Sequence, residues 1–333
     1  MSRRPLDDDS ETSRDIPLIR KFPALARIPR VALGRAPTPV ESLESLTPDL
    51  WIKRDDLAGT PLGGNKVRAL EYLLANVDRN DVVTTVGSVG STHALAVATY
   101  CAALGAEARI GRWRQEMNPA AERVSERLSH MVERAPVFRT PVGAYAWAVR
   151  ERIRGARWIA AGGSTPLGVL GHVNAGLELI EQIDAGVLPE PARVVVPLGT
   201  GGTAAGLALA FAIADRRIAV VGARVVPRVV ARRSHVERLA RRTAALIEKT
   251  TGETVPPVRG GLFLVAHEAY GGAYGRETAS GHAAAKALHA ARAIELDATY
   301  SAKAFAFALA LPRAARGPTL FWLTFDSRIL TAP

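Results

Sequence analysis

The chain has 333 residues, of which 48% are hydrophobic, and it carries a formal net charge of +11. This length predicts two domains or one large α/β unit with a substantial core. The single cysteine, Cys101, excludes an intrachain disulfide, and its apolar neighbours indicate a buried thiol in a reducing compartment. No apolar run approaches the roughly 20 residues of a membrane helix, and the N-terminal segment lacks a signal-peptide core. We therefore expect a soluble, cytoplasmic protein that does not act at a membrane.

Predicted strands and helices alternate along most of the chain. Residues 1–48 are polar and proline-rich, which predicts an irregular N-terminal arm with a short ordered part at 43–46. Continuous apolar strands between helices indicate parallel sheets covered on both faces, so we predict an α/β fold. After the arm, the predicted order is strand 50–54, a helix from 67 to 77, strand 82–86, helix 91–104, strand 108–110, helix 120–132, strand 137–139, helix 145–153, strand 158–161, helix 171–183, strand 194–197, helix 204–213, strand 219–223, a basic helix within 228–242 and strand 320–324.

The basic segment 228–242 raises the question of nucleic-acid binding. It contains six arginines and no aromatic residue, and its apolar positions Val236, Leu239 and Ala240 are spaced as on one face of a helix. A helix with a solvated arginine face explains this pattern better than a binding stripe. We therefore expect no nucleic-acid partner and keep nucleic-acid binding as the less favoured alternative.

Lys66 is the most informative residue of the chain. Basic charge is carried almost wholly by arginine, yet a lysine follows the glycine-rich turn Gly63-Gly64-Asn65 at the start of a predicted helix. A guanidinium stays protonated, whereas a lysine amine can lose its proton and attack a carbonyl carbon. The free N–H groups of a helix N-terminus also disfavour an ammonium and favour a neutral amine or an anionic ligand. The alternative is a surface lysine that follows a turn.

Two glycine-rich loops join predicted strands to predicted helices. The loop Gly199-Thr200-Gly201-Gly202-Thr203 opens a helix, so its amides and hydroxyls can converge on a phosphate. No acidic residue ends the next strand, as a dinucleotide site would require, so a cofactor with a single phosphate is favoured over a nicotinamide. In the other loop, residues 87–93, Ser91 is either an N-cap or a functional hydroxyl.

These motifs resemble those of a known enzyme family. The segments 51–57 (WIKRDDL) and 63–68 (GGNKVR) resemble the most specific motif of the 1-aminocyclopropane-1-carboxylate deaminase and D-cysteine desulfhydrase family, within the tryptophan synthase β superfamily. The glycine loop 199–203 is similar to the phosphate loop of that family. Residues 167–175, 274–275 and 297–303 match further family segments. The resemblance extends from about Leu50 to Thr324.

The resemblance implies a cofactor, an architecture and a set of site residues. The cofactor would be pyridoxal 5'-phosphate, with no metal, and the fold would be the fold type II arrangement: two open, twisted parallel-sheet α/β domains with the cofactor in the crevice between them. The expected units are the arm 1–48, a small domain 67–161, and a large cofactor-binding domain formed by 49–66 and 162–333. A homodimer is implied as well. The implied cofactor-binding residues are Lys66, Asn65, Thr92, Gly199, Thr200, Gly201, Gly202, Thr203, Ser301 and Thr324, and the implied catalytic residues are Lys66, Ser91, Tyr274 and Tyr300.

Ser301 favours one branch of the family. A hydroxyl beside the pyridine nitrogen leaves the ring largely unprotonated, whereas the deaminase branch is expected to have a glutamate there. The desulfhydrase branch has hydroxyl residues at the Ser301 and Thr324 positions, as this chain does. We therefore predict a lyase that acts on a small amino acid and yields a 2-oxo acid and ammonia, with D-cysteine as the model substrate. The alternatives are a 1-aminocyclopropane-1-carboxylate deaminase and a cofactor-binding protein with little turnover or a specialised biosynthetic role.

The predicted division of labour is specific. Lys66 would remove the α-proton, and Ser91 and Thr92 would hold the substrate carboxylate at their helix N-terminus. Tyr274 and Tyr300 would flank the leaving group or assist proton transfer.

The chain departs from the family pattern at three places. Gly90-Ser91-Thr92-His93 replaces Gln-Ser-Asn-His, and Ala69 replaces a basic residue three places after the cofactor lysine. After the last strand, Leu323-Thr324-Phe325-Asp326 replaces His-Thr-Gly-Gly, which adds bulk near the cofactor. Two hypotheses follow for Asp326: either it turns toward the pyridine nitrogen, or its loop swings outward and it pairs with Arg328 or solvent.

Overall fold

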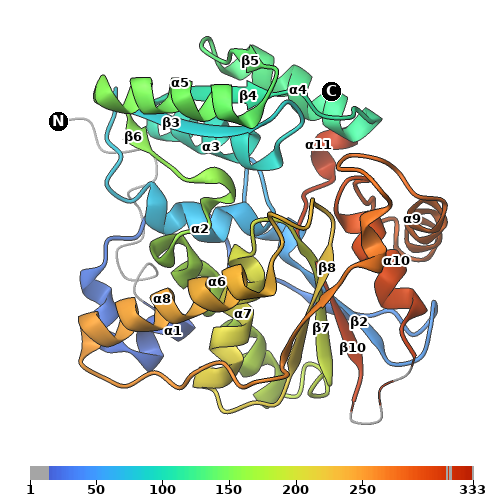
Figure 1. The fold of residues 1–333 in the computed structure, drawn as a ribbon. Coiled ribbons are helices and arrows are strands. Elements are labelled where there is room, and N and C mark those ends of the chain that lie inside the picture. The colour runs from blue at the N-terminus through green and yellow to red at the C-terminus, as the bar shows by residue number, and fades with distance from the viewer. Residues whose placement is uncertain (1–14, 313, 315–316, 332–333) are drawn as a thin grey trace.

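The strands of the protein form two separate sheets with helices packed on both faces (Figure 1). The fold was obtained as a computed structural model, which describes residues 15–312, 314 and 317–331. The larger sheet has the strand order β1-β2-β10-β7-β8-β9, and within the described residues only β1 runs antiparallel to its neighbour. Its strands are β1 (Val40–Ser42), β2 (Leu50–Arg54), β7 (Arg193–Leu198), β8 (Ala219–Arg224), β9 (Phe263–Ala266) and β10 (Thr319–Leu323).

Two hydrophobic clusters cover the two faces of the larger sheet. Val194 and Val196 of β7 pack with α6, α7 and α8, whereas Val195 between them packs with α9 and α10. This alternation follows from the period of two in a strand and explains why β7 is apolar throughout. The covering helices are α6 (Pro166–Asp184), α7 (Gly202–Ile213), α8 (Arg233–Thr251), α9 (Ala279–Arg292) and α10 (Ser301–Ala310).

The smaller sheet is parallel and has the strand order β5-β4-β3-β6. Ile110 of β4 packs with α3 and α4, while Val86 of β3 packs with α5. Its strands are β3 (Val82–Ser88), β4 (Glu107–Trp113), β5 (Val137–Phe138) and β6 (Arg157–Trp158), and its helices are α3 (Thr92–Leu104), α4 (Pro119–Met131) and α5 (Pro141–Ile153). The helix α2 (Asn65–Leu73) lies against α6, between the two sheets (Figure 1).

The predicted α/β fold with parallel sheets is confirmed. Cys101 is buried, as expected, and its burial raises the pKa of the thiol to about 12. Val236 and Leu239 of the basic helix are buried while Arg238 and Arg241 are exposed, so its arginines form a solvated face. No helix in the part of the chain that the structure describes is long and apolar enough to cross a membrane.

Several boundaries and elements differ from the predictions. The prediction of an irregular arm was wrong for residues 15–48, the part of the arm that the structure describes. The helix α1 (Pro17–Lys21) and the strand β1 are regular, and Leu18 and Leu43 are fully buried. Residues 1–14 lie outside the described residues. The strand β9 was not predicted. The helices α9 and α10 were not predicted either, because their alanine-rich segments give weak periodicity. The helices α5 and α6 begin at prolines, four or five residues before the predicted starts, since proline is favoured in the first turn.

Candidate active site

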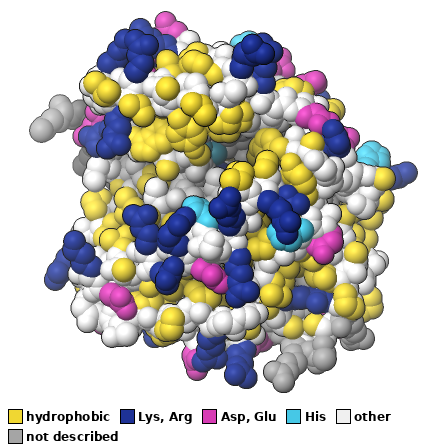
Figure 2. Space-filling view, in the orientation of Figure 1, with side chains coloured by type: hydrophobic (Ala, Val, Ile, Leu, Met, Phe, Trp, Pro, Cys, Tyr) yellow, Lys and Arg dark blue, Asp and Glu magenta, His cyan; other side chains and the backbone are white. Residues whose placement is uncertain are grey.

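A cavity of about 540 Å³ opens where the two sheets face each other. It is lined by residues at or just beyond the carboxyl ends of β3, β4, β7, β8 and β10, the position where open α/β sheets bind ligands. Figure 2 shows a hollow in this face of the molecule, bordered by hydrophobic side chains. The lining brings together Asn65, Lys66, Ser91, Thr92, Gly199 to Thr203, Tyr274, Tyr300 and Thr324, which are distant in sequence.

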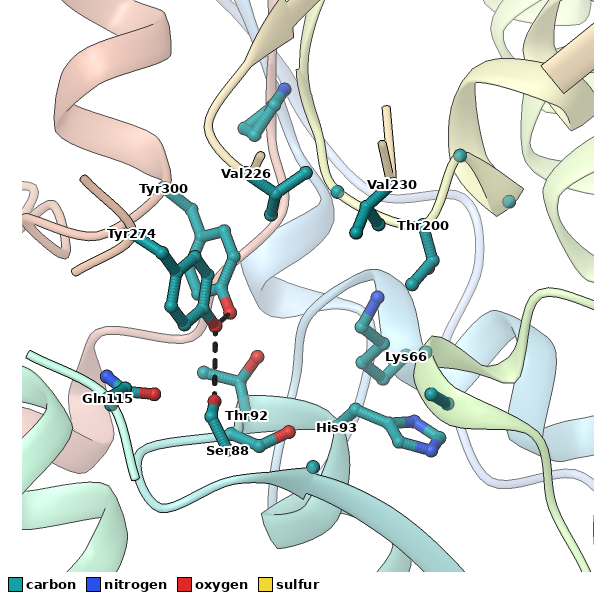
Figure 3. Close-up of a pocket in the computed structure, with 18 of the residues that line it drawn as sticks. Lys66, Ser88, Thr92, His93, Gln115, Thr200, Val226, Val230, Tyr274 and Tyr300 are labelled. Carbon is teal, nitrogen blue, oxygen red and sulfur yellow. Dashed lines mark hydrogen bonds between the residues drawn. The ribbon is translucent and has the colours of Figure 1, made fainter. Parts of the chain in front are cut away.

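Lys66 enters the cavity from the second position of α2, as its motif predicted. No carboxylate among the described residues pairs with it, and burial lowers the pKa of its amine to about 8. About a tenth of the amine is therefore neutral at pH 7, far more than for a lysine with the ordinary pKa of 10.5. Figure 3 shows the side chain extended into the cavity toward Thr200.

The glycine loop 199–203 forms a cradle beside Lys66. Gly201 has a φ of 89°, a left-handed conformation that favours glycine, and α7 begins at the next residue. The hydroxyls of Thr200 and Ser164 are hydrogen-bonded to each other at 2.7 Å, and Asn65 Nδ2 donates to Thr203 Oγ1 at 2.8 Å. The free N–H groups of the first turn of α7 point toward this place, so the loop suits an anionic group such as a phosphate.

The first turn of α3 forms a second wall. Ser91 Oγ accepts from the N–H of Ala94 at 3.2 Å, so Ser91 caps the helix while it also lines the cavity. His93 contacts Thr85 Oγ1 through Nε2 at 3.0 Å, and its Nδ1 has no partner in the described part of the chain. Burial, assisted by the charge of Lys66, lowers the pKa of His93 to about 3, so this imidazole is neutral.

Tyr274 and Tyr300 lie on the side of the cavity opposite Lys66 (Figure 3). Their hydroxyls are hydrogen-bonded to each other, and Ser88 Oγ lies 3.4 Å from the hydroxyl of Tyr274. Burial raises the pKa of both phenols, so both are protonated at neutral pH. The backbone of Tyr300 is held by Asp297, whose Oδ1 accepts its N–H at 2.6 Å.

One predicted site residue is not on the cavity wall. Ser301 is fully buried at the start of α10, and its Oγ has no hydrogen-bond partner among the described residues. Thr324, its expected companion, does line the cavity. Sequence reasoning missed a further set of lining residues, and their positions after apolar strands were the available signal. They include Ser88, His93, Trp113, Gln115, Val226 and Val230.

The loop after β10 does not swing outward, so that hypothesis was wrong. Phe325 lines the cavity and packs with Leu62 and Leu95, and Asp326 is only 3% exposed. Asp326 pairs with Arg328, as one hypothesis held, but its carboxylate is buried while Arg328 is exposed, and neither residue lines the cavity.

Together, an amine with a lowered pKa and an anion cradle in one cavity fit a cofactor that carries an aldehyde and a phosphate. Gly199 leaves the cradle open, since a Cβ there would meet no atom within 4 Å. The two-sheet fold and this site define the class of pyridoxal-phosphate enzymes of fold type II.

The chain belongs to the pyridoxal-phosphate dependent enzyme family, whose sequence model matches residues 31–324. It is 31% identical to a D-cysteine desulfhydrase of Klebsiella pneumoniae over 298 residues, 85% of this chain and 88% of the relative. It is 32% identical to the nocardicin C-9' epimerase of Nocardia uniformis over 317 residues, 91% of this chain and 94% of the relative. A solved structure described as an ACC deaminase homologue superimposes with a TM-score of 0.77 and 28% identity, over 93% of this chain and 98% of that one.

Proposed function

We propose that the protein is a pyridoxal-phosphate-dependent lyase that eliminates a β-substituent from a small amino acid, as a D-cysteine desulfhydrase does. One observation carries this proposal: the Lys66 amine and the hydroxyls of Tyr274 and Tyr300 lie on opposite sides of one cavity. An amine of pKa about 8 suits a base, and two protonated phenols suit an acid.

The proposed reaction balances with these groups and water. When bound, the cofactor supplies an electron sink for the negative charge that develops at the substrate Cα. Lys66 accepts the Cα proton, the Cα–Cβ double bond forms, and the Cβ–S bond breaks. The tyrosine pair donates a proton to the departing sulfur. Water then hydrolyses the unsaturated product to a 2-oxo acid and ammonia.

Substrate binding is proposed at the N-terminus of α3. The backbone N–H groups of Thr92 and His93 are among the first of this helix, and the hydroxyls of Ser91 and Thr92 lie beside them. A helix N-terminus attracts a carboxylate through its free N–H groups and its dipole. The neutral state of His93 avoids a second fixed charge next to Lys66.

The first alternative is a 1-aminocyclopropane-1-carboxylate deaminase. The residues that line the cavity in the described part of the chain include no Asp or Glu. Hydroxyl side chains such as that of Thr324 line it instead, and they would supply no charge to protonate a bound pyridine ring. This environment favours the unprotonated ring and therefore the desulfhydrase type of reaction.

A second candidate is epimerisation at Cα. It is supported by the similarity to nocardicin C-9' epimerase over 91% of this chain, and by acid–base groups on two sides of the cavity. In this reaction Lys66 would take the proton from one face of Cα and the tyrosine pair would return one to the other face. No bond at Cβ would break.

One set of measurements separates these candidates. The holoenzyme is mixed with D-cysteine or L-cysteine, and sulfide and pyruvate are measured. 1-Aminocyclopropane-1-carboxylate, which has no Cα proton, is supplied separately, and formation of a four-carbon 2-oxo acid and ammonia from it would support the deaminase. The two cysteines and larger amino acids are then incubated in D₂O, and the recovered material is analysed for deuterium at Cα and for inversion. Sulfide and pyruvate in equal amounts support elimination, whereas deuterium with inversion and no pyruvate supports epimerisation. A bound cofactor with no product from any of them would support a binding protein with little turnover or a specialised biosynthetic role.

We further propose a homodimer in the cytoplasm, with domain boundaries near residues 67 and 161. The family resemblance supports the dimer, the single buried thiol supports a reducing compartment, and the two sheets support a division into a small and a large domain. Light scattering at micromolar concentration tests the dimer, and a monomer would contradict it.

A further inference from the structure

The segment after β10 lies directly across the turn that carries Lys66. The N–H of Asn65 donates to the carbonyl oxygen of Thr324 at 3.0 Å, and the N–H of Gly63 donates to Asp326 Oδ2 at 2.7 Å. These two bonds join segments that are about 260 residues apart in the sequence. The last residues before Lys66 are therefore held by the C-terminal segment.

Arg328 completes this contact. Its Nε donates to Asp326 Oδ1 at 2.7 Å, and its Nη2 donates to Oδ2 at 2.6 Å, which is a bidentate ion pair. Nη2 also donates to the carbonyl oxygen of Gly59 at 3.2 Å. The pair Asp326 and Arg328, which we call the clamp, thus holds the turn through hydrogen bonds to the N–H group of Gly63 and the carbonyl oxygen of Gly59.

Close backbone packing makes the clamp specific to this turn. Gly64 has a φ of 92°, and a Cβ there would lie 2.7 Å from the carbonyl oxygen of Thr324. No side chain fits between the two segments, so the turn and the C-terminal segment touch through their backbones. A small shift of the segment after β10 must therefore move Asn65 and Lys66.

The clamp does not itself reach the reacting groups. Neither Asp326 nor Arg328 lines the large cavity, whereas Lys66 does. The Asp326 side chain is 2% exposed, and an unpaired carboxylate at that depth would be costly, so the ion pair with Arg328 compensates its charge. Phe325, the residue before Asp326, lines the cavity and packs in the same hydrophobic cluster as Leu62.

We propose that Asp326, together with Arg328, is a positioning residue that sets the direction in which Lys66 enters the cavity. The proposal rests on the proposed role of Lys66 as the lysine that carries the cofactor and moves the Cα proton. A misplacement of about 1 Å at a reacting group can lower a rate about a hundredfold, so the clamp can affect the reaction rate without touching the substrate.

The main test uses Asp326→Asn, which retains an acceptor for Gly63 but loses the charge opposite Arg328. Apo-protein is mixed with pyridoxal phosphate, and the rate of covalent attachment is followed by absorbance and by borohydride trapping with mass spectrometry. We expect attachment to Lys66 to slow at least about tenfold, kcat to fall by a similar factor and KM to change little. Attachment and kcat within twofold of the unmodified protein would overturn the proposal.

A matched control separates positioning from stability. Glu151 is also a carboxylate whose side chain is 2% exposed, and it pairs with Arg109 and Arg154 at 2.7 and 2.8 Å, away from the cavity. Glu151→Gln should lower the melting temperature as much as Asp326→Asn does, while covalent attachment keeps its normal rate. Equal slowing in both variants would overturn the proposal, because it would assign the effect to stability alone.

Two further variants keep the test decisive. If Asp326→Asn does not fold, Arg328→Ala serves instead, since the Arg328 side chain is 53% exposed and its loss breaks only the outer half of the clamp. Arg328→Lys retains the charge and should restore part of the attachment rate, and no difference from Arg328→Ala would count against the clamp. Lys66→Ala identifies the attached lysine: trapping that persists in this variant would reject the role of Lys66, independently of the clamp.

Discussion

Lys53 and Lys66 both extend into the interior of the protein, but only Lys53 has a carboxylate partner among the described residues. Lys53 is fully buried and donates to Glu178, Gln182 and the carbonyl oxygen of Thr38 at 2.6 to 2.7 Å. Lys66 lines the cavity and has no carboxylate partner among the described residues. The same type of side chain is therefore held in an ion pair in one place and is a candidate reactive amine in the other.

Lys53 belongs to a cluster of buried charges that pair mainly with one another. Arg68 binds Glu178 and Asp55, each at 2.8 Å, so two cations and two carboxylates meet in the interior next to α2. Burial alone would raise the pKa of Glu178, but the charges of Arg68 and Lys53 hold this pKa at about 2. Because Arg68 lies two residues after Lys66, this cluster also anchors the helix that carries the candidate amine.

The largest expected effect is at Lys66. Lys66→Ala should abolish covalent attachment of pyridoxal phosphate and lower kcat/KM by about a thousandfold or more, since base and cofactor anchor are lost together. Lys66→Arg should fail equally, because a guanidinium stays protonated. Absorbance of the loaded protein and borohydride trapping measure the attachment. An unchanged absorption band in either variant would mean that another lysine binds the cofactor.

Substitution of Lys53 should mainly lower the stability of the fold. Lys53→Met leaves Glu178 with less compensation in a dry environment, so we expect the free energy of unfolding to fall by about 3 kcal/mol. Chemical denaturation of the apo-protein gives this value. A loss below about 1 kcal/mol would show that Arg68 alone compensates the carboxylate.

The same substitution at Lys66, Lys66→Met, should have the opposite effect and raise the free energy of unfolding. Burial lowers the pKa of Lys66 from 10.5 to about 8, so the unfolded chain binds the proton more tightly than the folded one. Stability of the apo-protein should therefore rise as pH increases from about 8 to 10.5. Lys66→Met should stabilise the apo-protein by about 1–2 kcal/mol below pH 8, after allowance for partial exposure, and this gain should vanish near pH 10.5. Denaturation curves at pH 7, 9 and 10.5 measure the difference, and equal curves for both proteins at pH 7 would contradict it.

The expectations that succeeded rest on local patterns. The turn before Lys66, the loop 199–203 and the apolar strands each lie within a few residues, so the helix starts and the glycine-rich turns before them were predictable from the sequence. The cavity lining was predictable in part for the same reason, because the carboxyl ends of parallel strands share one edge. The helices α9 and α10 escaped prediction, since runs of alanine show little contrast between faces.

The sequence by itself determined the α/β class, the glycine-rich turn and the identity of the candidate amine, because each depends on short-range geometry and on the chemistry of one residue type. Only the tertiary structure decided which partners the charged groups found. It buried Ser301 away from the cavity wall, paired Lys53 with Glu178, and placed Asp326 on the turn before Lys66. Such contacts join segments that are more than 100 residues apart, so they follow from the order of strands in the sheet and not from any local pattern.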